Sequence, residues 1–186
     1  MRIVNLLILC IIFFATQNLL AASKYKFDSK AGKTVFETKG WPSLIVIKGE
    51  GLGAKGELIE DQKTLSGELI VDLTSLKTGI DLRDNHMKDK YLQVKDFPTA
   101  KLTITKMPIP EKLSGEVKFS GEMEVHGVTK KIEGMATLSS SENGVTVKAE
   151  FPLKLSDYKI EIPSYKGITV AEKVKVKFES SVVKTM

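Results

Sequence analysis

Apolar and polar residues alternate one by one along most of this chain from Lys24 onward. The stretch KLSGEVKFSGEMEVHG shows the pattern at its clearest, because every second residue is apolar or glycine and the residues between them are mostly polar. Its apolar side consists of Leu113, Gly115, Val117, Phe119, Gly121, Met123 and Val125. A period of two is typical of a β-strand with one buried face and one face in water. The pattern therefore predicts β-structure.

The same alternation recurs in several other segments, and short turns join a number of them. It is strongest in residues 65–73, 132–138, 145–155 and 174–178. The dipeptide His126-Gly127 lies between two alternating runs and predicts a tight hairpin, because glycine tolerates a positive φ and histidine tolerates it better than most residues. With the weaker candidates included, about eight strands with one apolar face each favour an all-β sandwich or a closed barrel.

Small residues recur on the apolar faces and allow two interpretations. They are Gly67, Gly115, Gly121, Gly134, Ala136 and Ala149. In an eight-stranded barrel, small inward residues would leave room for one small ligand. The same glycines would also suit β-bulges and close strand packing. The alternation alone leaves both interpretations open.

The start of the chain differs from the rest. Arg2 precedes the run IVNLLILCIIFFATQNLLAAS, in which two polar residues interrupt the apolar stretch and small residues follow at Ala21 and Ala22. We expect a secretory signal peptide at residues 1–22 rather than a transmembrane anchor, because the apolar run is short and a plausible cleavage point follows at once. We expect one domain in the remaining residues 23–186 of an exported protein.

The only cysteine, Cys10, lies inside that apolar run. The residues before it are bulky where a lipoprotein cleavage site needs small ones, so we do not expect lipid attachment there. A processed protein without cysteine has no disulfide, no catalytic thiol and no cysteine metal site. Its stability must come from the core and from hydrogen bonds.

Positive charge is in modest excess and is dispersed. The whole chain has a formal net charge of +5. Lys173, Lys175 and Lys177 alternate with apolar residues, which places them on the outer face of one strand. This is typical of a solvated face and not of a nucleic-acid site, which would combine a basic groove with interleaved aromatic residues.

One polar run, DLRDNHMKDKYLQVKDFP, departs from the strand pattern. Asp81 is an acceptable N-cap, and Arg83, Met87 and Tyr91 would lie one turn apart on one helical face. The later Phe-Pro pair would stop the helix. The run therefore predicts a short amphipathic helix laid over one end or the side of the barrel.

Catalytic and metal signals are weak. His86, in the same run, has Asp84 and Asp89 nearby as partners for a general base, but such neighbours are common on polar helix surfaces without chemistry. We therefore favour a structural or solvated histidine there. The sequence has no metal-binding histidine spacing, no phosphate loop and no nucleophile elbow. We predict no catalytic residue, no metal and no cofactor.

Two longer motifs are more specific. They are DLTSLKTGIDLRDNHMKDKYLQVKDFPTAKLTI, with its Arg-Asp-x-His run and later Phe-Pro-Thr, and GEMEVHGVTKKIEG. With both motifs in this order, the chain resembles the YceI-like family of exported bacterial proteins through most of the sequence after the signal peptide. The resemblance implies an extended antiparallel, eight-stranded, lipocalin-like β-barrel with a short helix on or near its rim. It also implies an apolar interior that holds a polyisoprenoid or another amphiphilic lipid, in the periplasm or outside the cell. A ligand in the interior would give the inward glycines a reason.

Two segments depart from the commoner pattern of that family. The stretch KAGKTVFETKGWPSLIVIKGEGLGAKGEL lacks the histidine-bearing strand that many members have there. The stretch LSDYKIEIPSYKGITVAEKVKVKFESS is longer between its last strands than the family pattern suggests. We expect both segments to shape the mouth of the barrel.

The leading interpretation is a non-enzymatic protein that sequesters or carries a lipid. The expected ligand is a polyisoprenoid, an isoprenoid quinone or a fatty-acid-like lipid, with no nucleic acid and no membrane span after processing. Residues chosen from the alternation as ligand-binding candidates are Ile45, Ile47, Leu69, Val71, Leu102, Ile104, Val117, Phe119, Met123, Phe151 and Phe178. For each of them, ordinary core packing is the competing interpretation.

Two alternatives from other functional classes stay open. One is an enzyme that acts on a small lipophilic substrate at the mouth, with His86 or Tyr91 nearby. The other is an envelope stress or interaction protein whose cavity is incidental. A homodimer is also possible.

Overall fold

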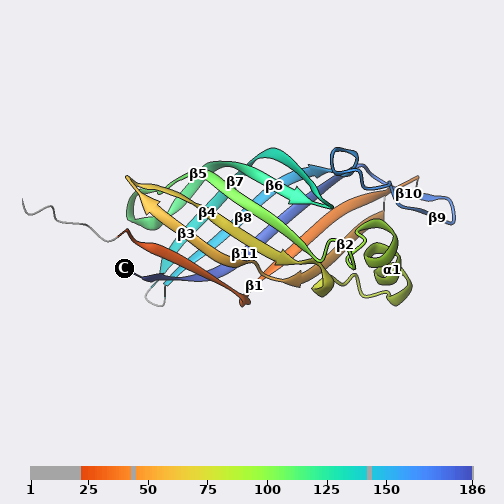
Figure 1. Ribbon diagram of the computed structural model, residues 1–186, viewed down its shortest axis with the longest axis horizontal. Coiled ribbons are helices and arrows are strands. Elements are labelled where there is room, and N and C mark those ends of the chain that lie inside the picture. Colours follow the sequence, from red (N-terminus) through yellow and green to blue (C-terminus); the bar gives the residue numbers. More distant parts are fainter. Residues whose placement is uncertain (1–21, 43–44, 142–143, 186) are drawn as a thin grey trace, which may run out of the picture.

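The computed structural model describes residues 22–42, 45–141 and 144–185. The expected signal peptide, apart from Ala22, and Cys10 lie outside the described residues. Strands dominate the fold (Figure 1): β1 (Lys24–Trp41), β2 (Ile45–Leu52), β3 (Lys55–Asp61), β4 (Thr64–Asp72), β5 (Thr99–Pro108), β6 (Gly115–Val125), β7 (Val128–Ser141), β8 (Gly144–Lys154), β9 (Ser164–Tyr165), β10 (Ile168–Val170) and β11 (Lys173–Thr185). The helical elements are η1 (Leu73–Ser75), α1 (Asp81–Asn85), η2 (His86–Tyr91), η3 (Glu111–Leu113) and η4 (Leu155–Tyr158).

These strands close into one antiparallel barrel. Hydrogen bonding follows the order β11-β8-β7-β6-β5-β4-β3-β1, and β11 also pairs with β1, which closes the sheet. β2 pairs with residues 33–40 of β1, and β3 pairs with residues 24–27 of the same strand. Because β2 and β3 run in the same direction beside β1, they are two parts of one interrupted strand. The barrel therefore has the eight strands that were predicted.

The interruption between β2 and β3 lies in the glycine-rich stretch GEGLGAKG. At this point β1 also bulges, between Phe27 and Gly32. The backbone N–H of Gly53 donates to the carbonyl oxygens of Ser29 at 2.9 Å and Gly32 at 3.1 Å. A side chain at Gly53 would collide with the backbone of Gly32, so glycine permits the close approach of the two bent chains.

Inward and outward side chains alternate as the sequence predicts. In β8, Val145, Val147 and Phe151 are buried, whereas Lys148 and Glu150 are exposed. This alternation follows from the pleat of a strand, which directs successive side chains to opposite faces. The apolar residues therefore line the interior, and the charged residues cover the outside.

The outward lysines of β11 form ion pairs across the outer face. Lys175 Nζ lies 3.4 Å from Glu150 Oε1, and Lys177 Nζ lies 2.7 Å from Glu37 Oε2. Lys173 is also exposed. Exposed pairs of this kind each contribute less than about 1 kcal/mol. The predicted solvated face is confirmed.

The tight hairpin between β6 and β7 is also confirmed. His126 and Gly127 have φ values of 52° and 69°, and Val125 pairs directly with Val128. Two positive φ angles in succession are what a two-residue hairpin turn of the right twist requires. Ser141 likewise pairs with Gly144 at the β7–β8 connection.

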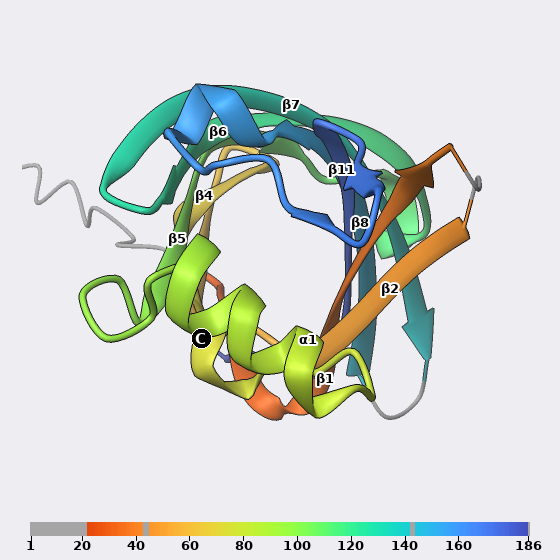
Figure 2. The same cartoon turned by 90° about the vertical axis from the view of Figure 1, so that its right-hand side faces the viewer.

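The two ends of the barrel differ. Large side chains with almost no exposed surface gather at the end where the chain enters β1 and leaves β11, and they are Tyr25, Phe27, Leu58, Leu65, Leu138 and Val182. These residues plug that end. At the opposite end lie α1, η2, η4 and the β9–β10 hairpin, arranged around the opening of the barrel (Figure 2).

The predicted helix exists, with different boundaries. α1 and the π-helical turn η2 together cover residues 81–91. Ile80 occupies the N-cap position without a side-chain hydrogen bond, so the assignment of Asp81 as the N-cap was wrong. The helix also ends before the Phe-Pro pair, because Gln93 adopts a φ of 49° and its carbonyl accepts hydrogen bonds from the N–H groups of Asp96 and Phe97.

The inward glycines allow strands to approach closely. A Cβ atom at Gly67 would collide with the carbonyl oxygen of Glu57, and one at Gly121 with that of Thr103. A Cβ atom at Gly134 would collide with the ring of Phe119. Of the two interpretations that the sequence left open, close packing is the correct one at these positions.

Within the described ranges, no helix is both long and apolar enough to cross a membrane.

Candidate functional site

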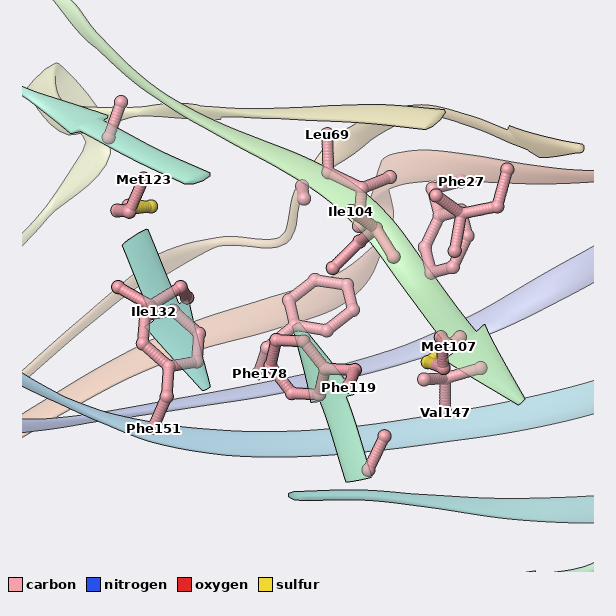
Figure 3. Close-up of a cluster of buried hydrophobic side chains, with 14 of the residues drawn as sticks. Phe27, Leu69, Ile104, Met107, Phe119, Met123, Ile132, Val147, Phe151 and Phe178 are labelled. Atoms are coloured by element: carbon pink, nitrogen blue, oxygen red, sulfur yellow. The ribbon is translucent and has the colours of Figure 1, made fainter. Parts of the chain in front are cut away.

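An apolar cavity of about 470 Å³ occupies the interior of the barrel. Its walls come from the inward faces of the barrel strands, and α1, η2, η4 and the β9–β10 region line its open end. The close-up in Figure 3 shows how side chains from several strands converge on this interior. A largely apolar cavity of this size is typical of small-molecule sites, which range over about 300–1,000 Å³.

Most of the predicted ligand-binding residues lie on the cavity wall. They are Ile45, Ile47, Leu69, Val71, Leu102, Ile104, Phe119, Met123, Phe151 and Phe178. Val117 does not line the cavity and packs against the buried core, one inward position nearer the plugged end than Phe119. That any of these residues contacts a ligand stays a prediction.

Two pairs of aromatic rings contribute to the wall (Figure 3). The rings of Phe119 and Phe151 lie 6.0 Å apart at an interplanar angle of 89°, and those of Phe27 and Phe178 lie 5.9 Å apart at 41°. Edge-to-face and tilted arrangements are the favourable ones for such pairs. The rings therefore hold one another in place and leave a rigid apolar surface toward the cavity.

Several wall residues were missed by the selection from the sequence. Phe36, Val147, Leu153 and Val176 belong to alternating strands and point inward like the chosen residues. The alternation of apolar and polar residues predicted that these side chains face the interior, but it does not predict their position along the barrel axis. A second missed group, Pro163, Ser164, Tyr165, Ile168 and Val170, lies in the long segment before β11 and has no periodic pattern that would have pointed to it.

The helix supplies the wall residues Leu82, Arg83, His86, Met87 and Tyr91. The predicted face formed by Arg83, Met87 and Tyr91 is thus the face turned toward the cavity. The helix covers part of the mouth, as the resemblance implied.

A polar cluster ties this helix to Thr78, which follows Lys77, a residue paired with Glu50 of β2. Asp84 Oδ1 accepts hydrogen bonds from the backbone N–H of Thr78 at 2.7 Å and from its hydroxyl. Arg83 Nε donates to Thr78 Oγ1 at 2.8 Å, and its Nη2 donates to the Thr78 carbonyl at 2.9 Å. Burial by itself would raise the pKa of Asp84, but the two hydrogen bonds from Thr78 and the nearby Lys88 and Arg83 outweigh it and lower that pKa. The cluster therefore contains a charged carboxylate at neutral pH.

The two histidines have different surroundings. His86 is exposed, and its ring lies 6.0 Å from the ring of Tyr165. In the part of the chain that the structure describes, it has no hydrogen bond or ion pair to a carboxylate. His126 lies with its Nδ1 3.2 Å from the Tyr158 carbonyl, its Nε2 3.0 Å from Gln93 Oε1 and its ring 4.6 Å from that of Phe97. His126 thus ties the β6–β7 turn to η4 and to the segment after the helix.

Tyr158 has an unpaired hydroxyl beside this cavity. The residue is 2% exposed and lines the cavity, and its hydroxyl has no hydrogen-bond partner among the described residues. Burial, with a smaller contribution from Asp157, raises the pKa of Tyr158 to about 12. The phenol is therefore neutral at any physiological pH.

Within residues 22–42, 45–141 and 144–185, no three His, Cys, Asp or Glu side chains are placed to hold a metal ion.

Comparison with known families identifies this barrel. The model of the YceI-like domain matches residues 25–182, which is nearly the whole barrel. The chain belongs to the YceI-like family. A UPF0312 protein of Vibrio vulnificus (strain YJ016) is 29% identical to this YceI-like chain over 120 residues, which cover 57% of the chain and 62% of the Vibrio protein.

Two solved structures share the fold. The crystal structure of Burkholderia cenocepacia BcnA superposes with a TM-score of 0.70 at 17% identity, covering 84% of the YceI-like chain and 99% of BcnA. A domain from Saccharophagus degradans, described as polyisoprenoid binding and implicated in plant cell wall breakdown, superposes with a TM-score of 0.64 at 17% identity and covers 84% and 98% of the two chains. At this identity the likeness shows the fold alone.

Proposed function

We propose that this YceI-like protein is an exported, non-enzymatic binding protein that sequesters or carries a polyisoprenoid or another amphiphilic lipid, such as an isoprenoid quinone. The observation that carries the proposal is the apolar cavity of about 470 Å³ inside the barrel. Transfer of a hydrocarbon chain into such a cavity contributes about 0.8 kcal/mol for each buried methylene. The description of the Saccharophagus degradans domain as polyisoprenoid binding supports the same ligand class.

Export and processing belong to the proposal. The signal-peptide pattern of residues 1–22 supports delivery to the periplasm or the outside of the cell, with residues 23–186 as the active domain. The surroundings of His86 support a binding role over an enzymatic one, because a general base needs a partner that orients it. Among the described residues, the ring of His86 lies beside that of Tyr165, and no carboxylate is paired with it.

The first test is extraction of the bound lipid. The protein is purified from its native envelope, extracted with organic solvent and examined by mass spectrometry beside a mock purification. We expect a stoichiometric isoprenoid or related lipid. Protein that comes out empty, and stays empty when polyprenols and quinones are offered, would contradict the proposal.

A pair of variants links the lipid to the cavity. Phe119→Asp places a charge in the apolar wall and should abolish lipid retention, because an unpaired buried charge opposes filling with hydrocarbon. Lys118→Asp changes the adjacent residue, whose side chain is exposed on the outer face, and should retain the lipid. Circular dichroism checks that both variants are folded. Retention of lipid by folded Phe119→Asp would remove this residue from the binding site.

A further inference from the structure

Exposed apolar side chains gather at the open end of the barrel. Ten large hydrophobic side chains are exposed in the described part of the chain, and six of them lie at this end. We call these six the apolar rim: Trp41, Ile45, Val46, Ile80, Leu82 and Tyr165. Each rim side chain exposes between 44% and 66% of its surface. Such a concentration in one place marks an interaction surface, whereas single exposed apolar residues need no explanation.

The apolar rim runs along one part of the opening, from β2 through β1, β10 and β9 to the helix. β1 ends at Trp41 and pairs with β2 on one side and β10 on the other, through Gly40↔Ile45 and Trp41↔Thr169. β10 pairs with β9, which carries Tyr165. The ring contact between Tyr165 and His86 then reaches the helix that begins after Ile80. Figure 2 shows these elements surrounding the opening.

The apolar rim is also continuous with the cavity. Five of its six members line the cavity, and Trp41 is the exception. A lipid that leaves the cavity along this wall would therefore pass from one apolar surface to the next.

The composition of the apolar rim fits the surface of a phospholipid bilayer. Tryptophan and tyrosine are enriched where membranes meet water, because one part of each ring system is apolar and another forms hydrogen bonds. Exposed lysines lie beside these residues: Lys39 on β1, and Lys166, whose Nζ lies 5.4 Å over the Tyr165 ring. Lysines beside an apolar patch complement the phosphates of lipid head groups. Asp81 is the acidic residue between Ile80 and Leu82, so the electrostatic attraction is modest.

We propose that the apolar rim docks on the surface of a phospholipid bilayer, with the mouth of the cavity facing the membrane. The rim side chains would enter the interfacial region without a span, as interfacial segments do. A lipid would then move between membrane and cavity without crossing water. Docking depends on the rim side chains, so it can be tested without knowing which ligand the cavity binds.

Vesicle flotation tests the proposal. Protein shown by its mass to lack residues 1–22 is mixed with phosphatidylcholine vesicles, with and without phosphatidylglycerol. We expect it to float with both kinds of vesicle, and to bind more tightly when phosphatidylglycerol is present. Trp41→Asp and Val46→Asp should reduce vesicle binding by about tenfold or more, because each removes one large apolar side chain from the buried contact. Val183→Asp, at a 62% exposed position near the plugged end, is the matched control and should bind like the wild type.

Trp41 provides a second readout because it is the only tryptophan in the sequence. Its fluorescence should shift to shorter wavelength when vesicles are added, and lipids brominated in their acyl chains should quench it. Since Trp41 does not line the cavity, Trp41→Asp should keep its extractable lipid while it loses vesicle binding. Protein that floats but yields no lipid would support docking and contradict only the carrier proposal.

Three outcomes would overturn the docking proposal. In the first, the wild-type protein does not float with either kind of vesicle. In the second, Val183→Asp weakens vesicle binding as much as Trp41→Asp does. In the third outcome, analytical ultracentrifugation would show a dimer that Trp41→Asp dissociates, in protein that does not bind vesicles. The apolar rim would then be an interface between two copies of the chain.

Discussion

Two buried tyrosines show how strongly a single hydroxyl depends on its partner. Tyr25 and Tyr158 are 1% and 2% exposed. The Tyr25 hydroxyl donates to Glu60 Oε2 at 3.1 Å, and Lys184 Nζ donates to the same oxygen at 3.2 Å. The Tyr158 hydroxyl has no hydrogen-bond partner in the described residues. A buried polar group without a partner costs about 1–3 kcal/mol, so the same chemical change should act in opposite directions at the two positions.

Tyr158→Phe should leave the protein as stable as the wild type or stabilise it by up to about 1 kcal/mol, because it removes an unpaired buried hydroxyl and keeps the ring. Tyr25→Phe, the matched control, should lower the free energy of unfolding by about 1 kcal/mol, because it breaks a hydrogen bond to a carboxylate. Urea unfolding followed by circular dichroism measures both. A loss of more than about 1 kcal/mol in Tyr158→Phe would show that the hydroxyl has a stabilising partner.

The raised pKa of Tyr158 predicts a loss of stability at high pH. Burial raises this pKa to about 12, whereas the unfolded phenol titrates near its ordinary value of about 10. Between these values the unfolded state releases a proton that the folded state keeps, so the free energy of unfolding falls as pH rises. Tyr158→Phe should therefore lose less stability than the wild type between about pH 10 and 12. Urea unfolding at several pH values measures this. If the free energy of unfolding fell equally with pH in Tyr158→Phe and in the wild type, the raised pKa of Tyr158 would be contradicted.

At the scale of single residues, the sequence predicted which side chains face the interior better than it predicted their position along the barrel axis. Alternation placed Phe119, Met123 and Phe151 on the inner face, and all three line the cavity. It also selected Val117, which lies nearer the plugged end and does not line the cavity. A period of two specifies the face of a strand but contains no information about position along the barrel axis, so the limits of the cavity were not predictable.

At the scale of the elements, a polar side-chain cluster adds to the apolar packing of the helix against the core. Its N-terminus has no side-chain cap, and the carboxylate of Asp84 holds Thr78 in the chain that leads into it. Helices as short as residues 81–91 are marginal in isolation and need tertiary contacts. The hydrogen bonds among Asp84, Thr78 and Arg83 fix the start of the helix, and apolar packing against the core holds the rest of it over the mouth.

Asp84→Asn should loosen this helix. The change weakens charge-assisted hydrogen bonds at a buried position, so the free energy that stabilises the helix on the protein should fall by about 1–3 kcal/mol. Amide hydrogen exchange of residues 81–91 should accelerate about tenfold or more, while the strands keep their protection. Asp81→Asn, an exposed change in the first turn of the same helix, is the control and should have a smaller effect. Unchanged exchange in Asp84→Asn would show that other contacts hold the helix.

The same carboxylate predicts a dependence on acid. Since the pKa of Asp84 is lowered in the folded protein, its contribution is present at neutral pH and is lost as pH falls through that lowered value. Exchange of residues 81–91 should rise at acidic pH in the wild type, after correction for the intrinsic pH dependence of exchange. Asp84→Asn should show no such additional rise, and an equal rise in both proteins would assign the effect to another group.

The sequence predicted most elements and missed two connections. The β6–β7 hairpin follows from His126-Gly127, whose positive φ angles suit the turn. The stretch GEGLGAKG lies between two strand candidates and predicts a hairpin or a bulge there. That β2 and β3 are two parts of one barrel strand was not predicted, because it depends on the bulge of β1 against Gly53, a contact between segments that are distant in sequence. The β9–β10 hairpin was expected only as extra length near the mouth, since strands of two and three residues are too short to show a period.

Across the whole molecule, the main feature is the difference between its ends. Large buried side chains plug the end where β1 begins and β11 ends, whereas helices, turns and the β9–β10 hairpin surround the open end. The eight barrel strands run between these two ends, with β2 and β3 together as one of them, and their alternation does not distinguish one end from the other. Strand number and turns favoured a sandwich or a closed barrel, and the resemblance to the YceI-like family selected the barrel. The volume of the interior was not predictable, because it depends on how side chains from eight strands meet in space.

The cavity itself can be tested by filling it. Ala149 lies on β8, lines the cavity and is not fully buried. Ala149→Phe places a ring in open space, so the free energy of unfolding should change by less than about 1–3 kcal/mol, the usual cost of overpacking a filled core. The amount of lipid recovered per protein by extraction and mass spectrometry should fall about tenfold or more, because the ring occupies volume that the chain of the ligand needs. Ala31→Phe adds the same ring at an exposed position and should keep the wild-type lipid content. Full lipid occupancy in folded Ala149→Phe would place the ligand elsewhere, and the barrel interior would then be a site of packing and not of binding.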